Sequence, residues 1–144
     1  MKNIFLSLVT ALLLSVSFNS AQAQCNAFTK KKCMPTLSPY IHNGQLNSVS
    51  LTPGEDAELV MTFYSGQDYR LLVCNQEVLG DVSFKVLDSQ HTQLFDSKED
   101  KTGQWDFNVK STQQLIVQVI VPPAKSKTGI VDQGCVSVLV GFKK

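Results

Sequence analysis

The sequence lacks both an excess of charge of one sign and any long apolar run beyond its first residues. Lys and Arg number 13 and Asp and Glu number 12 among 144 residues. Proteins that bind nucleic acid carry a clear basic excess, so this balance argues against a nucleic-acid partner. A membrane-spanning helix needs about 20 apolar residues, and no segment after the N-terminal run reaches that length. The sequence therefore predicts no transmembrane segment.

Motifs of the common catalytic and metal centres are also missing. There is no HExxH, no GxSxG and no CxxC, and neither histidine lies beside a cysteine. Such motifs hold a zinc ion, a serine nucleophile or a redox pair at a fixed spacing. Without them we expect the protein to be no enzyme and to need no cofactor. A small secreted enzyme remains the third hypothesis, because paired catalytic carboxylates meet only in the fold.

The N-terminus has the three parts of a secretory signal peptide. Lys2 supplies a positive charge, residues 4–16 form an apolar run, and Ala21 and Ala23 are the small residues that signal peptidase requires. Cleavage after Ala23, which defines residues 1–23 as the signal peptide, would leave residues 24–144, enough for one domain. We therefore expect an exported protein, located in the periplasm or outside the cell.

The four cysteines all follow the expected cleavage site, and an even number in an exported chain predicts two disulfides. They are Cys25, Cys33, Cys74 and Cys135. Of the three pairings we favour Cys25 with Cys33, which would close a short loop, and Cys74 with Cys135, which would join two strands. Lipidation is a competing fate of Cys25, but a lipidated cysteine normally follows a small residue and here follows Gln24. A lipoprotein anchor is therefore not expected.

Apolar and polar residues alternate in nearly every segment after residue 45, which is typical of half-buried strands. The strands that this pattern predicts are 46–51, 57–64, 69–74, 82–86, 92–95, 105–110, 115–121 and 135–142. Residues 115–121 are nearly all apolar, so we expect a central strand covered on both faces. About eight short, mostly antiparallel strands favour a single all-β, jelly-roll-like β-sandwich over residues 46–144. Residues 24–45 show no helical period and are expected to form an irregular arm.

The order of several segments gives the chain a resemblance to a known family. The segments are Leu51–Glu55, Phe63–Leu71 and Val82–Asp88, followed by a charged loop and Trp105–Val109. In this order of strands and turns the chain resembles the jelly-roll sandwiches of the bacterial pre-peptidase C-terminal type and, more distantly, Golgi-dynamics domains. The resemblance covers about Val49 to Phe142. It implies a binding or accessory role, sometimes with calcium.

Acidic side chains gather around the charged loop at residues 96–104. Four carboxylates could supply part of the six to eight oxygens that calcium requires; they are Asp96, Glu99, Asp100 and Asp106. Two lysines are interleaved among them and the spacing is not that of an EF-hand, so a solvated loop is the competing interpretation. A calcium-stabilised structural or accessory domain of a surface assembly is therefore the alternative function.

Aromatic side chains outside the core are the candidates for ligand contacts. Tyr40 lies in the arm and Tyr64 falls on the strand face opposite Phe63, so both are candidate ligand-binding residues. Trp105 is in phase with Phe107, and we assign it to the core. The sequence thus predicts an exported, non-enzymatic module that binds a protein, a glycan or another cell-envelope component through its loops.

Overall fold

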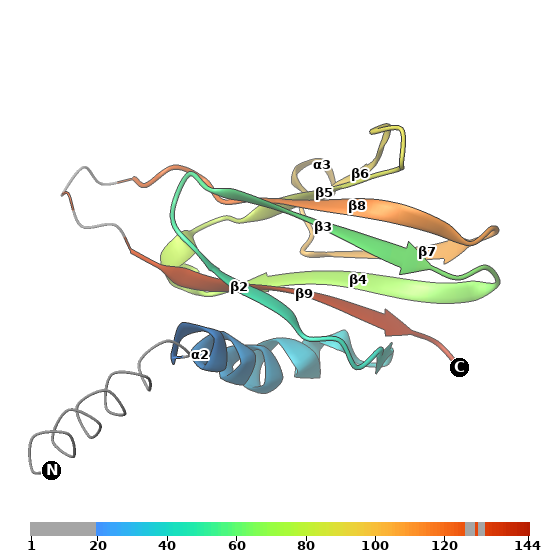
Figure 1. Cartoon of the computed structure of the whole chain (residues 1–144), viewed down its shortest axis with the longest axis horizontal. Coiled ribbons are helices and arrows are strands. Elements are labelled where there is room, and N and C mark those ends of the chain that lie inside the picture. The colour runs from blue at the N-terminus through green and yellow to red at the C-terminus, as the bar shows by residue number, and fades with distance from the viewer. Residues whose placement is uncertain (1–19, 126–128, 130–131) are drawn as a thin grey trace, which may run out of the picture.

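The computed structural model describes residues 20–125, 129 and 132–144. Two antiparallel sheets face each other, and a helical arm lies beneath one of them (Figure 1). The strands of this described part are β1 (Ile41–His42), β2 (Asn47–Leu51), β3 (Asp56–Phe63), β4 (Gln67–Asn75), β5 (Ser83–Leu87), β6 (Gln93–Asp96), β7 (Gln104–Val109), β8 (Gln113–Ile120) and β9 (Gly134–Phe142). The helical segments are α2 (Ser20–Phe28), η2 (Thr29–Cys33), η3 (Met34–Leu37), η4 (Glu77–Leu79) and α3 (Ser97–Asp100).

Sheet A has the strand order β1-β9-β4-β7, with β2 also paired to β9, and sheet B has the order β3-β8-β5-β6. Every strand pair is antiparallel. All eight predicted strands are present, each end within two residues of its predicted position. The prediction of an all-β sandwich is therefore confirmed. None of the helices in the described ranges is both long and apolar enough to cross a bilayer.

The core between the sheets is built by the alternation that the sequence shows. Phe63, Leu71, Phe84 and Val117 come from four different strands, and none of them is more than 1% exposed. Burying one such side chain stabilises the fold by about 1.5–3 kcal/mol. The polar residues between them face outward, because successive side chains of a strand point to opposite faces.

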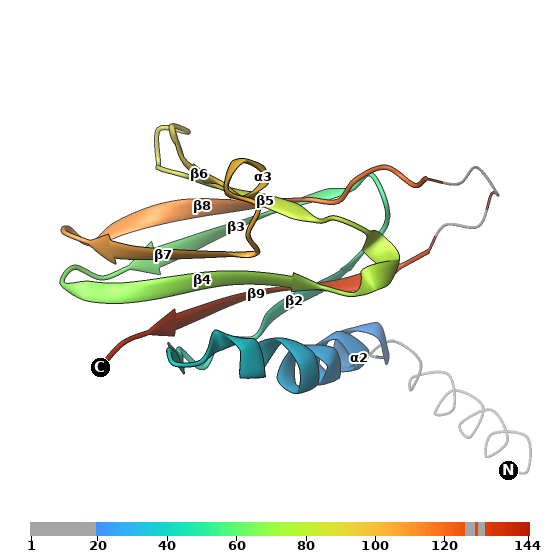
Figure 2. The same ribbon diagram turned by 180° about the vertical axis from the view of Figure 1, so that it is seen from behind.

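The strand that is covered on both faces is β9, not β8. In β8, Leu115 and Val117 face the core and are buried. Ile116 and Gln118 point to the opposite face and are only half-buried. The prediction that residues 115–121 are covered on both faces is therefore wrong. Every residue of β9 except the last is buried, because sheet B packs on one face and the helical arm on the other (Figure 2).

The helical arm, residues 20–37, replaces much of the irregular segment expected over residues 24–45. Cys25, Thr29, Cys33 and Leu37 follow one another at intervals of four, which places them on one helical face. None of these four side chains is more than 1% exposed. Thr29 Oγ1 donates to the Cys25 carbonyl at 2.7 Å and lies 2.5 Å from the Ser137 hydroxyl oxygen in β9. The one polar side chain on this face is therefore fully hydrogen-bonded.

A glycine in β9 allows the arm to approach sheet A closely. A Cβ atom at Gly141 would lie 2.7 Å from Tyr40 Cβ and 3.0 Å from Leu37 Cγ. Any larger residue would therefore push the arm off the sheet. Leu37 packs there with Leu72 and Leu139, which form a second, smaller core outside the sandwich.

Both disulfides tie the arm to sheet A. Cys25 is bonded to Cys135 and Cys33 to Cys74, so two disulfides are confirmed but both favoured pairings are wrong. Along a helix, Cys25 and Cys33 lie roughly 12 Å apart, whereas a disulfide joins Cα atoms within about 7 Å. Cys74 lies opposite Ser137, so Cys74 and Cys135 project from the same face of sheet A. That face is the one the arm covers, and each strand cysteine therefore meets an arm cysteine.

One long side of the sandwich is closed by stacked aromatic rings. Trp105 on β7 stacks on Phe95 of β6, with ring centroids 5.3 Å apart, and on Phe107 at 4.1 Å. Phe95 in turn packs on Phe84 at 5.3 Å. Because β7 belongs to sheet A and β6 to sheet B, Trp105 joins the two sheets. It packs against the core, as the sequence predicted.

Candidate functional site

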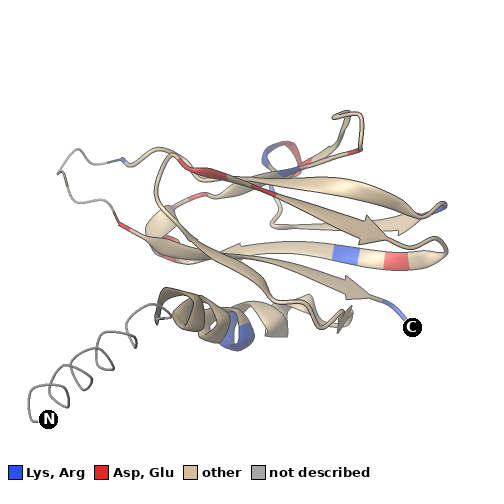
Figure 3. Ribbon diagram, in the orientation of Figure 1, with Lys and Arg blue, Asp and Glu red and all other residues tan. Residues whose placement is uncertain are grey.

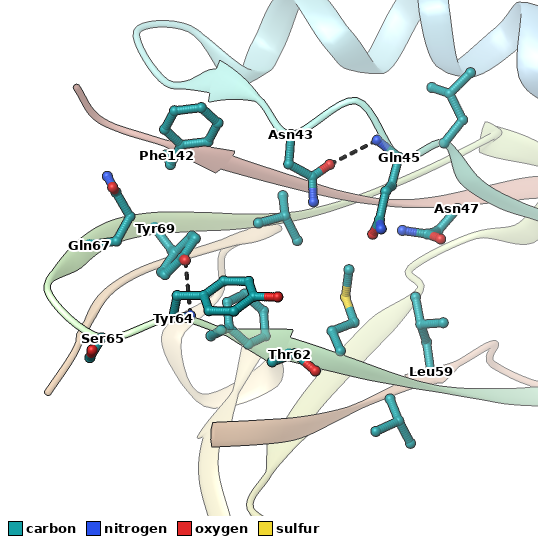
Figure 4. Close-up of a pocket in the computed structure, with 15 residues that line it drawn as sticks. Asn43, Gln45, Asn47, Leu59, Thr62, Tyr64, Ser65, Gln67, Tyr69 and Phe142 are labelled. Carbon is teal, nitrogen blue, oxygen red and sulfur yellow. Dashed lines mark hydrogen bonds between the residues drawn. The ribbon is translucent and has the colours of Figure 1, made fainter. Parts of the chain in front are cut away.

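The opposite long side of the sandwich is open. A cleft of about 1010 Å³, here called the open-edge cleft, separates the edge strand β3 of sheet B from the β1–β2 edge of sheet A (Figure 4). Its apolar lining comes from both sheets and includes Met61, Phe63, Val140 and Phe142. A smaller groove of about 360 Å³ shares Leu46, Asn47 and Leu59 with it and continues along the same edge.

Carboxamide side chains line the sheet A wall of the cleft. Asn43, Gln45 and Asn47 lie on that side in Figure 4. Ile41 is opposite Phe142 and Asn47 is opposite Val138, so the edge has two more residues than the matching stretch of β9. Such extra residues bulge away from the partner strand, and they carry the amides into the cleft.

Hydrogen bonds between residues close in sequence fix the shape of this bulge. Gly44 N–H donates to His42 Nδ1 at 3.3 Å, and His42 Nε2 lies 3.1 Å from the Gln45 carbonyl oxygen. Asn43 Oδ1 accepts from Gln45 N–H at 3.0 Å, the arrangement of an Asx-turn. Gly44 has a φ of +90°, which favours glycine. The backbone of the bulge and the Asn43 carboxamide are therefore held in place before any ligand arrives.

Asn47 has a polar atom left without a partner at the cleft. Its Nδ2 is buried and makes no hydrogen bond to the described residues, and Figure 4 shows the amide turned toward Gln45. A buried donor without an acceptor costs about 1–3 kcal/mol. A ligand oxygen would remove that penalty once the side chains around this buried atom moved to admit it.

The opposite wall is β3 with the residues that follow it. Met61 and Phe63 point into the core, whereas Val60 and Thr62 point outward and are exposed. Tyr64 is 65% exposed at the rim, as the sequence predicted, and its backbone N–H donates to Tyr69 Oη at 3.1 Å. The structure thus places candidate Tyr64 on the cleft, with its main chain anchored to the core.

No strong acid or base lines the open-edge cleft. Its fifteen lining residues, all of them described, include no Asp, Glu, His, Lys, Arg or Cys. The hydroxyls of Thr62, Tyr64, Ser65 and Tyr69 and the carboxamides supply the polar atoms of its lining. The cleft can therefore bind a ligand through amide and hydroxyl hydrogen bonds and apolar contacts.

The other candidate tyrosine, Tyr40, lies elsewhere and joins the arm to the sheet. The Arg70 guanidinium lies 4.4 Å from the centre of its ring, and Lys143 Nζ lies at 5.2 Å. Arg70 also forms two 2.7 Å hydrogen bonds with the Asp106 carboxylate. These bonds lower the pKa of Asp106 and raise the pKa of Arg70 from their ordinary values. Tyr40 therefore packs in a charged cluster on sheet A and is not brought together with Tyr64.

The four carboxylates considered for calcium are not brought together. Asp96 Oδ1 caps α3 by accepting from Lys98 N–H at 2.9 Å, and its Oδ2 lies 3.5 Å from Lys85 Nζ. Asp106 is paired with Arg70, while Glu99 and Asp100 lie within α3. Within the described part of the chain, no three acidic, histidine or cysteine side chains are arranged to hold a metal ion. The calcium site therefore stays a prediction, and two of its proposed ligands, Asp96 and Asp106, already have other partners.

The carboxamides of the cleft were missed by the sequence analysis. Residues 43–47 contain Asn, Gln and Asn at every second position, which places side chains on one side of an extended segment. That spacing was the available signal, but Asn43 and Gln45 lay in the segment expected to be an irregular arm and Asn47 in the strand predicted over residues 46–51. The local pattern also does not show that β3 would lie opposite residues 43–47.

Comparisons with known proteins give partial matches in structure alone. No protein-family model matches the chain, and no curated protein sequence matches it significantly. The resemblance to pre-peptidase C-terminal domains therefore stays a prediction. The structure of Aeromonas hydrophila PliG, a periplasmic lysozyme inhibitor of g-type lysozyme, is 14% identical, covers 69% of this chain and 85% of that one, and has a TM-score of 0.49. Salmonella Typhimurium PliG, also an inhibitor of g-type lysozyme, is 12% identical, covers 69% and 86%, and has a TM-score of 0.40. At these scores neither likeness decides what this chain binds.

Proposed function

We propose that the protein is an exported, non-enzymatic binding module. In this proposal the open-edge cleft holds an uncharged, hydrogen-bonding part of a protein, a glycan or another cell-envelope component. The observation that carries the proposal is the lining of the cleft: carboxamides over an apolar floor, with no strong acid or base. Binding sites combine a mostly apolar surface with a few fixed polar groups in this way.

The chemistry of the rim suits a ligand rich in neutral polar groups. The side chains of Asn43, Gln45 and Asn47 each offer both donors and an acceptor. Tyr64 adds a rigid aromatic ring that loses little conformational entropy on binding. A charged ligand would leave water and find no counter-charge in the cleft, which is unfavourable.

Export is supported by the cysteines as well as by the N-terminal sequence. All four cysteines form disulfides, which persist in oxidising compartments. The sulfur of Cys25 is bonded to Cys135, which supports the expectation that this cysteine carries no lipid anchor. Most of the proposed signal peptide, including residues 4–16, lies outside the described residues, and its cleavage after Ala23 stays a prediction.

Binding by cleft variants would test this function. The mature protein would be screened against an array of neutral glycans and a library of random peptides. Tyr64→Ala and Gln45→Ala should weaken any binding about tenfold or more, the loss typical of central contacts. Leu94 is an exposed apolar residue on β6, away from the cleft. Leu94→Ala should therefore leave the binding unchanged. Binding that withstands both cleft variants would contradict the proposed site.

A g-type lysozyme can be measured in the same assay as one defined protein. The two PliG proteins are inhibitors of that enzyme, and the proposal above does not depend on the result. Binding that Tyr64→Ala weakens and Leu94→Ala does not would make this lysozyme a ligand of the cleft. Binding with the opposite pattern would place the contact on the closed side.

A further inference from the structure

The free edge of β3 exposes an ordered row of backbone groups. Val121 N–H donates to the Glu55 carbonyl at 3.0 Å, and the pairing then continues one for one from Asp56 opposite Ile120 to Phe63 opposite Gln113. In an antiparallel ladder, hydrogen-bonded and non-hydrogen-bonded pairs alternate. The odd-numbered residues of β3 therefore bond to β8. The N–H and C=O groups of the even-numbered residues point to the free edge.

Two of the other sheet edges are covered, bulged or short, and β3 is none of these. Against β2, Ser48 Oγ donates to Asn26 Oδ1 of α2 at 2.8 Å, so the helical arm lies along this edge. The bulge between β1 and β2 interrupts the same edge, and β6 has only four residues, with a register shift in its pairing to β5. Covering elements and bulges protect edges from pairing with other chains. β3 has eight residues in unbroken register and no covering element in the described part of the chain.

Side chains divide this edge into an acidic half and an apolar half. Asp56 and Glu58 are exposed in the first half. Val60 is 59% exposed and Tyr64 65% exposed at the other end, where β3 carries no charge (Figure 3). A partner that matches this edge has an apolar part and, next to it, a basic group.

Building on the proposed function, we propose that the ligand is an extended polypeptide segment of a partner protein, which adds to sheet B as a further strand beside β3. Its backbone bonds to the free N–H and C=O groups of Val60 and Thr62. Alternate side chains of the segment enter the cleft, where a neutral polar one reaches Asn47, and the others cover Val60. A basic side chain of the segment lies beside Glu58.

The repeat of the edge favours a polypeptide over a glycan. The free groups of β3 recur at every second residue, about 6.8 Å apart, which is the repeat of another extended chain. Strand addition of this kind obtains affinity from main-chain hydrogen bonds and specificity from alternate side chains. A glycan can use the amides and Tyr64, but it cannot continue the ladder.

A peptide with blocked amides gives the first test. Random peptides of eight residues, the length of β3, would be selected on the mature protein, and each N–H of a selected peptide would then be methylated in turn. We expect affinity to fall about tenfold at every second position, the value of a well-formed hydrogen bond, and little between. A loss without this period would overturn strand addition. If neutral glycans bind the cleft and no peptide does, the proposed function stands and this inference fails.

A matched pair of variants at Val60 tests the same contact from the protein side. Val60→Pro removes an N–H that points away from β8, so it deletes no bond of the sheet, and it should weaken peptide binding about tenfold or more. Val60→Thr keeps the N–H and should bind like the parent protein. Equal affinity of the two variants would overturn the proposal. If Val60→Pro does not fold, the methylated peptides decide the question on the unaltered protein.

The acidic half of the edge is tested by charge reversal. Glu58→Lys should weaken a selected peptide with a terminal lysine several-fold at low salt, and the difference should shrink as salt screens the charges. Glu77→Lys makes the same change of charge at an exposed residue of η4. It is the control and should have little effect on the affinity. Equal losses from both variants would contradict the placement of a basic group beside Glu58.

Discussion

The two long sides of this sandwich are built from the same pair of sheets but end in opposite ways. On one side Trp105 and Phe95 stack at 5.3 Å between β7 and β6 and fill the space between the sheets. On the other side no ring bridges β2 and β3, and a cleft of about 1010 Å³ remains. The closed side is thus filled by aromatic side chains from both of its edge strands, whereas the open side is not.

The open side also has the surface features of a binding site. Of the large apolar side chains that are exposed on the described residues, four lie on or beside β1, β2 and β3; they are Ile41, Val49, Val60 and Tyr64. Clustered exposed apolar residues mark interaction sites more often than scattered ones do. In our proposal the closed side provides stability, and the open side is where a partner binds.

The largest expected effect concerns the arm, which supports the open side through β9. Replacing Cys25 and Cys135 together by Ala removes a link across 110 residues, nominally worth about 4–5 kcal/mol in the chain-entropy model. Urea unfolding under non-reducing conditions measures the loss. Because β9 carries the β1–β2 edge, peptide binding should fall as well. A variant as stable as the parent would show that packing alone holds the arm.

The next effect compares one aromatic residue from each side. Trp105→Ala should lower the free energy of unfolding by about 3 kcal/mol, because the ring is packed against the core on the closed side. Tyr64→Ala should change it by no more than about 0.5 kcal/mol, since that ring is exposed at the open side. Urea unfolding of both variants gives the comparison. Equal losses would remove the distinction between the two sides.

A smaller effect is expected from the ion pair that joins β4 to β7, the edge strand of the closed side. Asp106→Asn should lower stability by less than about 1 kcal/mol near neutral pH, because the Asp106 side chain is 43% exposed and solvent screens the pair. Hydrogen bonding to Arg70 lowers the pKa of Asp106. Its contribution is therefore complete above the unfolded-state pKa, near 3.9, and is lost as the pH falls through the lowered folded-state pKa.

Unfolding of the parent and Asp106→Asn from neutral to strongly acid pH measures this dependence. The two stabilities should converge only in the acid range, below the ordinary pKa of an aspartate. A difference that stayed constant to the lowest pH would show that the carboxylate charge contributes nothing. Lys98→Ala, on α3, provides a control that should show no such convergence.

The smallest effect on stability is expected at Asn47, where the cleft leaves a buried amide unpaired. Asn47→Leu has a similar volume and removes that amide, so stability should stay equal or rise by about 1 kcal/mol. Binding of the selected peptide should nevertheless weaken. Thermal unfolding and a binding titration measure the two properties. A strongly destabilised variant would mean that Asn47 supports the fold and not the ligand.

The sequence predicted the sandwich well because strands have a local signal. Alternation such as Leu59, Met61 and Phe63 identifies both a strand and its buried face within a few residues. The arm has a local signal too, at Cys25, Thr29, Cys33 and Leu37, but it is carried by two cysteines and a threonine. Those residues do not form an obvious apolar stripe, and the cysteines were interpreted as closing a loop. The wrong disulfide pairing followed from that interpretation.

The cleft could not be predicted in the same way because it depends on contacts between distant segments. Residues 43–47 and β3 meet only after β2 pairs with β9 and β3 with β8. Tyr64 was identified because its exposure follows from strand alternation, whereas Tyr40 depends on the packing of the arm. Asp106 was assigned to a cation site because its partner Arg70 is 36 residues away in sequence. The contacts of Tyr40 and Asp106 thus depend on partners that sequence spacing does not show.

Amide hydrogen exchange of the mature protein, free and with a selected peptide, tests the central claim most directly. In the free protein we expect Val60 and Thr62 amides to exchange rapidly and Met61, bonded to β8, to exchange slowly. With the peptide bound, Val60 and Thr62 should become protected, while Phe95 and Trp105 on the closed side should not change. Protection on the closed side, or binding without protection of Val60 and Thr62, would contradict the account.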